Sequence, residues 1–325
     1  MKVRFGFVAM SMHLEKASPS QTTTVTNFLK IADREAGLRK ITNLAHGNLV
    51  NTLRILRHAL AAGVYVYRFT SKLIPLYGHE LTREWDFFPY LAQDFREIGR
   101  FVREEGMRVS FHPDHFTLIN SPDTGVVQRS IDDLKRHVSI LEAMELDDQA
   151  KLVIHIGGGY KDKASALERF ITNWSELPSE VQARITLEND DKIFTAAETL
   201  QVCKQLGMPM VLDIHHHWCN SGGQSIKEMV KPIFTTWQAT GLPPKIHVSS
   251  PKSEQDKRSH ADFICAEALF DFLNLAKDIT EALDVMVEAK QKDEALFRLV
   301  KELGTFPGIT LESPGIVVFD AAKEL

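Results

Sequence analysis

The sequence is poor in cysteine and contains no long hydrophobic run. Its 325 residues include three cysteines, Cys203, Cys219 and Cys265. These are too few and too scattered for a disulfide framework or for a closely spaced pair of zinc-binding thiolates. No apolar stretch in the sequence approaches the roughly 20 residues that a membrane helix needs. The opening MKVRFGFVAM is too short and too mixed for a signal peptide. We therefore expect a cytoplasmic protein with no membrane partner.

An excess of basic residues and a flexible linker are also missing. The formal net charge is −5, whereas nucleic-acid-binding proteins usually carry a basic excess. A polyanionic partner is still compatible with this value, because charge can be concentrated on one face and bound divalent cations add positive charge. No Pro-, Gly- or Ser-rich segment divides the chain. We therefore expect residues 1–325 to form a single domain.

Short apolar runs alternate along the chain with longer segments of helical periodicity. The predicted strands are 5–10, 64–69, 107–112, 151–156, 183–189, 209–214, 244–250 and 284–290. Apolar strands separated by amphipathic helices indicate a parallel sheet covered on both faces. Eight evenly spaced strands favour a closed (β/α)8 TIM barrel. A doubly wound open sheet in two domains is the alternative. After about residue 291 we expect a tail with one helix, 294–303, and a loose end.

Imidazole and carboxylate side chains lie at or near the ends of six predicted strands. They are His112, His155, Glu188, Asp213, His247 and Glu288. All strand C-termini of a parallel barrel open on one face, where active sites are built. Clustered buried carboxylates resist ionisation unless a cation balances them, and a divalent metal is the usual remedy. One strand-end histidine alone would more often be a core or loop residue, but six such residues in one ring predict a metal site.

Two further histidines extend this set. His216 follows Asp213 by three residues, so a carboxylate and an imidazole can approach one site from a strand end and the next turn. His260 follows the seventh predicted strand by a short loop. Mixed nitrogen and oxygen ligands fit Zn²⁺, Mn²⁺ or Fe²⁺ better than Mg²⁺ or Ca²⁺. This many ligands suffices for two or three ions, and a carboxylate such as Glu188 can bridge two of them.

Several longer segments resemble the ultraviolet damage endonuclease family. They are FGFV (5–8), YRFxSxLIPLxxH (67–79), SFHP (110–113), IHIGGGY (154–160), LENDDK (187–192), DxHH (213–216), PKxHVSSPKSEQ (244–255), RSHAD (258–262) and VEAKQKD (287–293). The resemblance runs in order over most of the chain. It implies a TIM barrel related to endonuclease IV, with three metal ions, that cuts DNA 5′ to cyclobutane pyrimidine dimers and 6-4 photoproducts. It also implies a monomer whose partner is damaged double-stranded DNA.

The resemblance assigns the metal ligands residue by residue. The first ion would be held by His112, His155 and Glu188. The second would be surrounded by Glu188, Asp213, His247 and Glu288. The third would be held by His216 and His260, with Lys245 nearby, a lysine that is carboxylated in some relatives. Mn²⁺ is the favoured ion and Zn²⁺ the second choice. The residues expected to carry the catalysis are Glu188, Lys245, His247 and Glu288.

The resemblance also points to residues that contact DNA, and here the chain departs from its relatives. Arg68, His79 and Lys290 match polar positions that line the family's site. In HPDHF, His115 replaces the usual Gln, while Phe116 keeps the aromatic residue. Near the first strand, where relatives tend to offer Asn and sometimes Tyr, this chain has Phe7, Met10 and Ser11. These changes leave the ligands intact but bear on lesion preference. The alternative for Phe116 is a place in the core.

Two rival functions are considered. A two-metal sugar isomerase has the same fold, and fold alone does not give function. Such an isomerase does not need a third pair of ligands such as His216 and His260. A catalytically silent DNA-binding or metal-holding protein is the other rival, and the intact ligand set argues against it.

Overall fold

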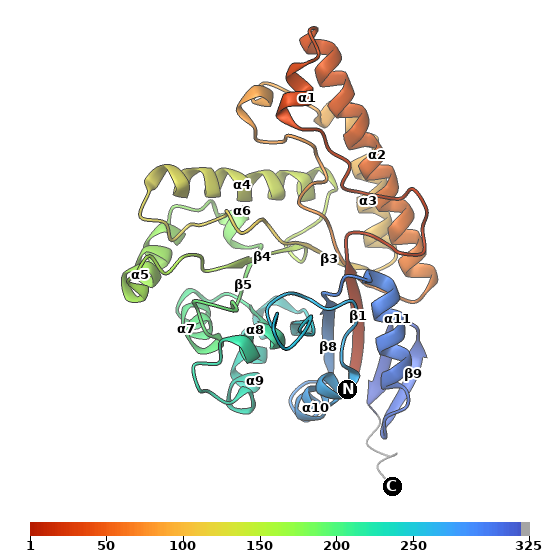
Figure 1. Ribbon diagram of the computed structural model, residues 1–325, viewed down its shortest axis with the longest axis vertical. Coiled ribbons are helices and arrows are strands. Elements are labelled where there is room, and N and C mark those ends of the chain that lie inside the picture. The colour runs from red at the N-terminus through yellow and green to blue at the C-terminus, as the bar shows by residue number, and fades with distance from the viewer. Residues whose placement is uncertain (320–325) are drawn as a thin grey trace.

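The computed structural model describes residues 1–319 and contains a closed barrel of eight parallel strands (Figure 1). The strands are β1 (Lys2–Val8), β2 (Val66–Arg68), β3 (Arg108–Phe111), β4 (Lys151–His155), β5 (Ile185–Glu188), β6 (Met210–Asp213), β7 (Lys245–Val248) and β8 (Ala282–Val287). Each pairs in parallel with the next, and β1 pairs with both β8 and β2. This confirms the predicted TIM barrel and excludes the doubly wound open sheet, because an open sheet would leave β1 or β8 at an edge.

Helices connect the strands and cover the barrel (Figure 1). They are α1 (Val25–Leu29), α2 (Arg34–Ala61), η1 (Glu80–Thr82), α3 (Phe88–Glu104), α4 (Thr124–Ala143), α5 (Lys163–Trp174), α6 (Ser179–Gln182), α7 (Ala196–Leu206), α8 (Ile214–Cys219), α9 (Ile226–Thr235), η2 (Gln238–Thr240), α10 (Ala266–Ala276) and α11 (Lys292–Leu303). Local sequence fixes their ends. In α7, Thr195 and Glu198 form a reciprocal capping box, and Gly207 ends the helix with a φ of 69°. In α4, the side chain of Asp123 accepts hydrogen bonds from the first backbone amides.

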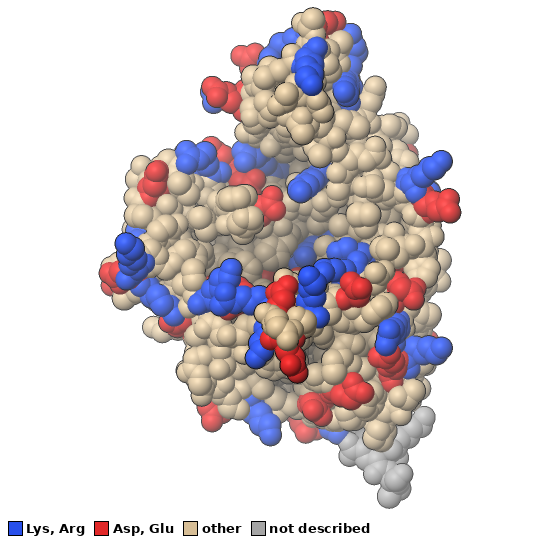
Figure 2. All heavy atoms as spheres, in the orientation of Figure 1, with Lys and Arg blue, Asp and Glu red and all other residues tan. Residues whose placement is uncertain are grey.

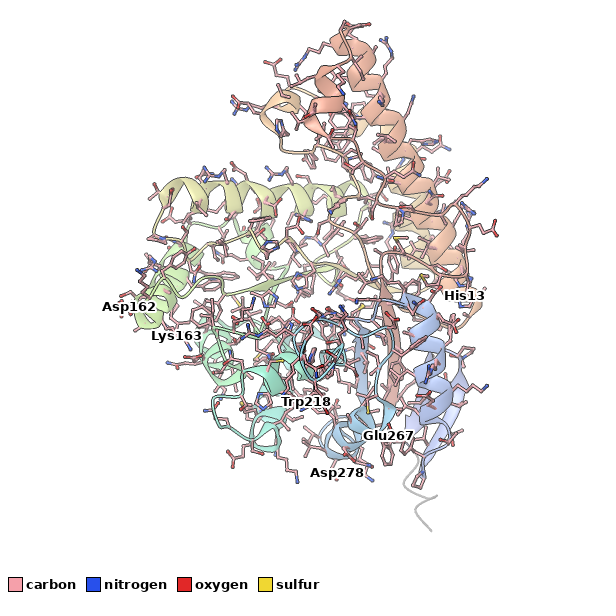
Figure 3. The ribbon with its side chains drawn as sticks, in the orientation of Figure 1. His13, Asp162, Lys163, Trp218, Glu267 and Asp278 are labelled. Carbon is pink, nitrogen blue, oxygen red and sulfur yellow. The ribbon has the colours of Figure 1, made fainter. Side chains whose placement is uncertain are left out.

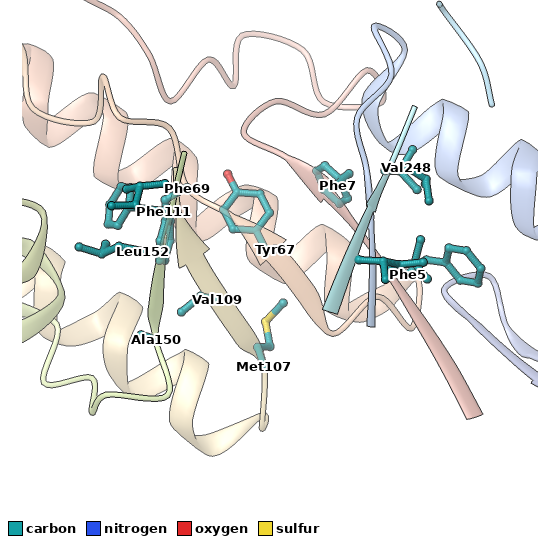
Figure 4. Packing of buried hydrophobic residues seen from close by; sticks show 14 of the residues in the cluster. Phe5, Phe7, Tyr67, Phe69, Met107, Val109, Phe111, Ala150, Leu152 and Val248 are labelled. Atoms are coloured by element: carbon teal, nitrogen blue, oxygen red, sulfur yellow. The ribbon is translucent and has the colours of Figure 1, made fainter. Parts of the chain in front are cut away.

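The aromatic part of the core includes strand residues that form a chain of ring contacts. Phe7, Tyr67, Phe69 and Phe111 follow one another with ring centroids 5.5, 5.4 and 5.1 Å apart (Figure 4). All four are buried. Because side chains alternate along a strand, the residues beside these aromatics point the other way, into the barrel. Arg68, next to Tyr67, reaches Glu288 at the end of β8.

The barrel interior is largely polar, because ion pairs and hydrogen bonds join its strands, some of them between strands that are not neighbours, such as β3 and β8. At the amino end of the strands, Arg4 and Arg108 share the fully buried Asp284. Farther along, Nζ of Lys245 donates to Oγ of Ser110 at 2.9 Å. The carboxyl end holds the predicted ligands. The alternation of strand residues thus places a stack of polar layers inside the barrel, with the candidate site on top.

The end of the chain differs from the predicted loose end. Ile309–Ser313 (β9) and Ile316–Phe319 (β10) form an antiparallel hairpin, and β10 pairs with Lys2, Val3 and Arg4 of β1. The expectation was wrong for these residues, because the run IVVF is rich in β-branched residues and extends the sheet beyond the barrel. Residues 320–325, the last part of the expected loose end, lie outside the described part of the chain.

Among residues 1–319, no helix is both long enough and apolar enough to span a membrane.

Candidate metal centre

The predicted ligands meet at the carboxyl end of the barrel. Glu188 and Asp213 are the last residues of β5 and β6, His155 is the last residue of β4, and His112 and Glu288 follow β3 and β8 directly. Each therefore lies at the end of a strand or directly after it.

Glu188 lies at the middle of this cluster and is 1% exposed. Its Oε2 lies 2.9 Å from Nε2 of His112 and 3.7 Å from Nε2 of His155. Its Oε1 lies 2.8 Å from Nδ1 of His247 and 3.8 Å from Nδ1 of His216. The two carboxylate oxygens thus face different sets of imidazoles.

Two groups of potential metal ligands follow from this geometry. His112, His155 and Glu188 form one, and Glu188, Asp213 and His247 form the other, with donor atoms within 4.8 Å of one another in each. These groups have the composition that the sequence predicts for the first two ions, except that Glu288 lies beside the second. Glu188 belongs to both groups, as a bridging carboxylate would.

Backbone carbonyls fix the tautomers of three histidines. Nδ1 of His112 bonds the carbonyl of Pro113 at 3.1 Å, Nδ1 of His155 that of Glu188 at 3.2 Å, and Nδ1 of His216 that of Asn189 at 2.9 Å. A carbonyl oxygen only accepts, so Nδ1 carries the proton in each ring. In a neutral ring this leaves the lone pair of Nε2 for a metal ion, an arrangement common to metal-binding histidines.

Asn189 is a residue that the prediction missed. It is fully buried, its Oδ1 accepts from the backbone N–H of Asp213, and its Nδ2 donates to the backbone carbonyl of Asp213, both at 2.9 Å. Its own carbonyl orients His216. Asn189 therefore aligns two candidate ligands at once. Its place directly after Glu188 in the LENDDK segment was the available signal.

The predicted third pair lies at the edge of the cluster. Nδ1 of His216 lies 3.7 Å from Oδ2 of Asp213, and Nδ1 of His260 lies 3.9 Å from Oε2 of Glu288. The rings of His155 and His216 are 5.7 Å apart. Among residues 1–319, His216 and His260 do not complete a third group of three ligands. They flank the two groups, His216 beside Asp213 and Glu188 and His260 beside Glu288.

Protons on imidazoles balance the buried carboxylates in this structure. Burial alone would raise the pKa of Glu188, but His247 and His155 hold it well below its usual range. Burial would likewise lower the pKa of His216, but Asp213, Glu188 and Glu288 raise it to about 9. The pKa of His247 is also raised by Glu188 and Glu288 against the effect of burial. A divalent cation can replace these protons.

Protons on the imidazoles do not fully offset the negative charge of the buried carboxylates, as the environment of Asp213 shows. Burial, with smaller contributions from Glu188 and Glu288, raises the pKa of Asp213 to about 7. Its Oδ2 and the Nε2 of His247 are buried and have no hydrogen-bond partner. Orphaned polar atoms of this kind are costly. Together with the mixed imidazole and carboxylate donors, they fit a transition-metal centre.

Lys245 lies one layer below His247 on β7 and is 2% exposed. Burial, and then the neighbouring Arg108, hold the pKa of Lys245 well below its usual value. Its amine bonds the hydroxyl of Ser110. The predicted catalytic residue therefore lies beneath the cluster.

The residues expected to contact DNA divide into two sets. His115 and Phe116 are exposed on the loop after β3, with ring centroids 4.0 Å apart. Phe116 is 73% exposed, which overturns the alternative that it belongs to the core. Lys290 is exposed just after β8. Arg68 bonds Glu288 inside the barrel mouth.

Three other expected contacts lie elsewhere. Phe7 has no exposed surface and packs on Tyr67, so direct contact with DNA is not available to it. Ser11 is buried, and its hydroxyl bonds Asp293. Nδ1 of His79 accepts from the backbone of Leu81 and caps η1. The sequence resemblance marked these positions, but their strand and loop geometry turns the side chains inward or into a cap.

A cavity of about 480 Å³ opens over the cluster. Its lining includes Arg68, His112, Glu188, His216 and Glu288. The molecule is hollowed across the face seen in Figure 2, and Lys and Arg side chains gather along the lower edge of that hollow. A larger cavity, about 760 Å³, is lined by Arg4 and Arg108 at the opposite, amino end of the strands and is remote from this chemistry.

The fold and the cluster together define a class of protein: a TIM barrel with an imidazole- and carboxylate-rich centre, suited to divalent metal, at the carboxyl end of its strands. A family model described as UV-endonuclease UvdE matches residues 3–320. The chain belongs to this UV-endonuclease family.

Relatives and solved structures agree with this assignment. A UV DNA damage endonuclease of Halalkalibacterium halodurans is 43% identical over 98% of this chain and 100% of its own length. One of Bacillus pumilus is 43% identical over 95% of this chain and 96% of its own. The crystal structure of SacUVDE is 28% identical, with a TM-score of 0.81, and covers 94% of this chain and 100% of its own.

More distant structures share the fold alone. Endonuclease IV from Thermus thermophilus matches with a TM-score of 0.51 at 13% identity, covering 88% of this chain and 93% of its own. An L-ribulose 3-epimerase matches with a TM-score of 0.52 at 15% identity, covering 88% and 81%. The barrel therefore does not by itself separate a nuclease from an epimerase. The family match does.

Proposed function

We propose that this protein is a metal-dependent DNA repair endonuclease that hydrolyses the phosphodiester 5′ to ultraviolet photolesions, with cyclobutane pyrimidine dimers and 6-4 photoproducts as substrates. The main support for the proposal is the position of Glu188, which belongs to both ligand groups. One of its carboxylate oxygens lies beside His112 and the other beside His247. The matched relatives are named for ultraviolet-damaged DNA. A site with adjacent divalent ions suits phosphodiester hydrolysis.

The proposed cofactor is a set of three divalent ions, with Mn²⁺ favoured. His112, His155 and Glu188 would hold one, Glu188, Asp213, His247 and Glu288 the second, and His216 with His260 the third. Bound divalent ions lower the pKa of water and stabilise charge on the attacked and leaving oxygens. Glu188 would be shared by the first two ions, and the carbonyls bonded to Nδ1 of His112 and His155 leave the Nε2 atoms of these rings facing Glu188.

Arg68 and Lys245 would support the reaction from the interior of the barrel. Arg68 bonds Glu288 and lines the cavity over the cluster, so its guanidinium can also neutralise a phosphate there. Lys245 is proposed to be carboxylated. Its buried amine has Arg108 and Arg68 among its charged neighbours, and these cations would stabilise the carbamate anion. All of the ligands come from one chain, as the proposed monomer requires.

Lesion recognition is assigned to the loop after β3. Damaged nucleotides stack poorly and cost less to extrude from a duplex. His115 and Phe116 form an exposed pair of rings beside His112, and stacking on an aromatic ring can fill the gap that an extruded base leaves. His115 in place of Gln makes lesion preference the property most open to change in this chain.

A defined substrate tests the proposal. A duplex oligonucleotide with a single cyclobutane dimer should be cut once, 5′ to the dimer, and its undamaged counterpart should stay intact. Treatment with a chelator should abolish cutting, and added Mn²⁺ should restore it. Cutting that persists without metal, or that ignores the lesion, would contradict the proposal.

A further inference from the structure

Buried cations lie at the amino end of the barrel, opposite the metal centre. Arg108 and Lys151 begin β3 and β4, Arg184 directly precedes β5, and each of the three is at most 7% exposed. Within residues 1–319, Asp284 is the one buried carboxylate at this end of the strands. Basic groups are therefore in excess here, whereas the carboxyl end gathers the carboxylates.

Two of the basic groups at this end share one carboxylate. Nε and Nη2 of Arg4 donate to Oδ1 and Oδ2 of Asp284, both at 2.7 Å, and Nη1 of Arg108 donates to Oδ2 at 2.6 Å. Burial lowers the pKa of Arg108 and Asp284 raises it, the effect of burial being the larger. A buried charge that is not fully compensated costs free energy, and a bound anion offsets that cost.

Both guanidinium groups keep donors for a further acceptor. Nη2 of Arg108 is buried and has no hydrogen-bond partner within the described residues, and the Trp237 ring, 4.7 Å from Cζ of Arg108, offers only its π face. Arg4 uses Nε and Nη2 for Asp284, which leaves its Nη1, and its side chain is 25% exposed. Because Asp284 fixes one edge of this guanidinium, the other edge is held ready for an oxyanion.

Arg4 and Arg108 line the cavity of about 760 Å³ at this end of the barrel. Most of the other lining residues are apolar and include Val102, Met107, Leu242 and Ile316. A cavity of this size, with apolar walls and a few converging polar groups, is typical of a site for a small organic molecule.

Three carboxylates also line the cavity, and all three are exposed to solvent. Oε2 of Glu145 is paired with Arg103 at 2.9 Å. Oε1 of Glu312 is paired with Lys2 at 2.6 Å. The third is Asp147. Because exposed charges are screened by water, these carboxylates oppose an anion near Arg4 only weakly.

We infer that this cavity is a second ligand site, which binds a small organic oxyanion, a phosphate monoester or a carboxylate carried on an apolar ring. The oxyanion meets Arg4, with the charge of Arg108 beside it, and the ring packs against the apolar walls. The site lies at the opposite end of the barrel from the metal centre, and the inference does not rest on the proposed function.

Calorimetric titration of the metal-loaded full chain tests the ligand class with four compounds: phenyl phosphate, benzoate, inorganic phosphate and benzyl alcohol. Phenyl phosphate should bind about 10- to 100-fold more tightly than inorganic phosphate, because its ring is buried. Benzoate should bind as well, and the tighter of the two ring compounds identifies the preferred oxyanion. Benzyl alcohol, which has no charge, should not bind. Equal affinity for inorganic phosphate and phenyl phosphate would overturn the assigned ligand class.

Variants test the position of the site. Arg4→Gln should weaken the binding of phenyl phosphate at least tenfold, because it removes a charge-assisted hydrogen bond. Gln149 is exposed and lines the cavity, so Gln149→Glu should lower the affinity and Gln149→Lys should raise it, each about 2- to 10-fold at low salt. These two variants still decide the inference if Arg4→Gln fails to fold.

Lys163→Gln is the matched control, because it also removes one cation. Lys163 lies at the start of α5, on the other side of the molecule from β1 (Figure 3), and its side chain is 44% exposed. The affinity for phenyl phosphate should stay at the wild-type value. Binding that neither Arg4→Gln nor the Gln149 variants change would place the compound elsewhere, at the metal centre for example, and would overturn the inference. So would a failure of both ring compounds to bind, which would leave the arginines with the sole role of closing the end of the barrel.

Discussion

Oε1 of Glu188 lies 2.8 Å from Nδ1 of His247, while its other oxygen faces His112 on the opposite side. A single carboxylate thereby joins two halves of the cluster. The consequences of this arrangement can be measured directly.

Glu188→Gln should reduce the rate of nicking at least 10³-fold, which is roughly 4 kcal/mol of barrier. The amide keeps the shape of the side chain but removes the charge that the proposed ions share. The measurement is the single-turnover rate on a dimer-containing oligonucleotide, with Glu168→Gln on the surface of α5 as control. A loss smaller than tenfold would refute the bridging role.

Purified protein should carry more than one transition-metal ion per chain. The two ligand groups that share Glu188 supply the first two positions. Elemental analysis of protein prepared without chelator provides the count. A content of one ion or fewer in fully active protein would rule out the cluster.

Metal binding should release protons and tighten as the pH rises. Asp213 and other carboxylates raise the pKa of His216 to about 9, so this imidazole is protonated at neutral pH and must lose its proton to bind a metal. Below that pKa, each released proton should increase the apparent affinity by up to about tenfold per pH unit. Calorimetry in two buffers of different ionisation enthalpy reports the protons, and His216→Gln should release fewer. Equal heats in both buffers would contradict this.

Asp213→Asn should stabilise the metal-stripped protein while weakening metal binding. Burial raises the pKa of Asp213 to about 7, so ionising this carboxyl costs the folded state more than the unfolded chain. This free-energy cost to the folded state grows as the pH rises from the usual pKa of an aspartate to about 7. Above that pH it stays constant. The gain in Tm at pH 8 should therefore be at least about 2–4 °C and should shrink at pH 5. A loss of Tm at pH 8 would show that the ionised carboxylate stabilises the fold.

Phe116→Ala should weaken binding to photolesion DNA by about 5- to 150-fold, the equivalent of 1–3 kcal/mol of stacking. Metal content should not change, because Phe116 is not a candidate ligand. Its exposure also predicts little change in Tm. Affinity, metal content and thermal unfolding are to be measured on the same sample. Unchanged affinity would remove Phe116 from lesion recognition.

The sequence was most informative where side-chain chemistry coincides with strand periodicity. Apolar runs located all eight barrel strands, and the polar residues at or near six of their ends located the cluster around Glu188, because a parallel barrel brings those ends together. Orientation was harder to predict. Ser11 turns toward Asp293, 282 residues away in sequence, and Phe7 packs against Tyr67 of the neighbouring strand, and neither partner can be identified from the local sequence. Asn189 was missed because it acts through backbone groups, so that its position directly after Glu188 was the one signal of its role in the sequence.

The hairpin at the end of the chain has a consequence for how the barrel closes. Lys2 pairs with Val318 and Arg4 with Ile316, so the lower part of β1 finds one of its partners in the last described strand. Contacts this distant in sequence are slow to form, because a long loop must close before they contribute. The first strand therefore completes its hydrogen bonding only when the end of the chain is in place. The ring that positions Glu188 and His247 is closed by β1 with β8 and β2, and the remaining backbone groups of its closing strand are satisfied by a segment that carries none of the chemistry.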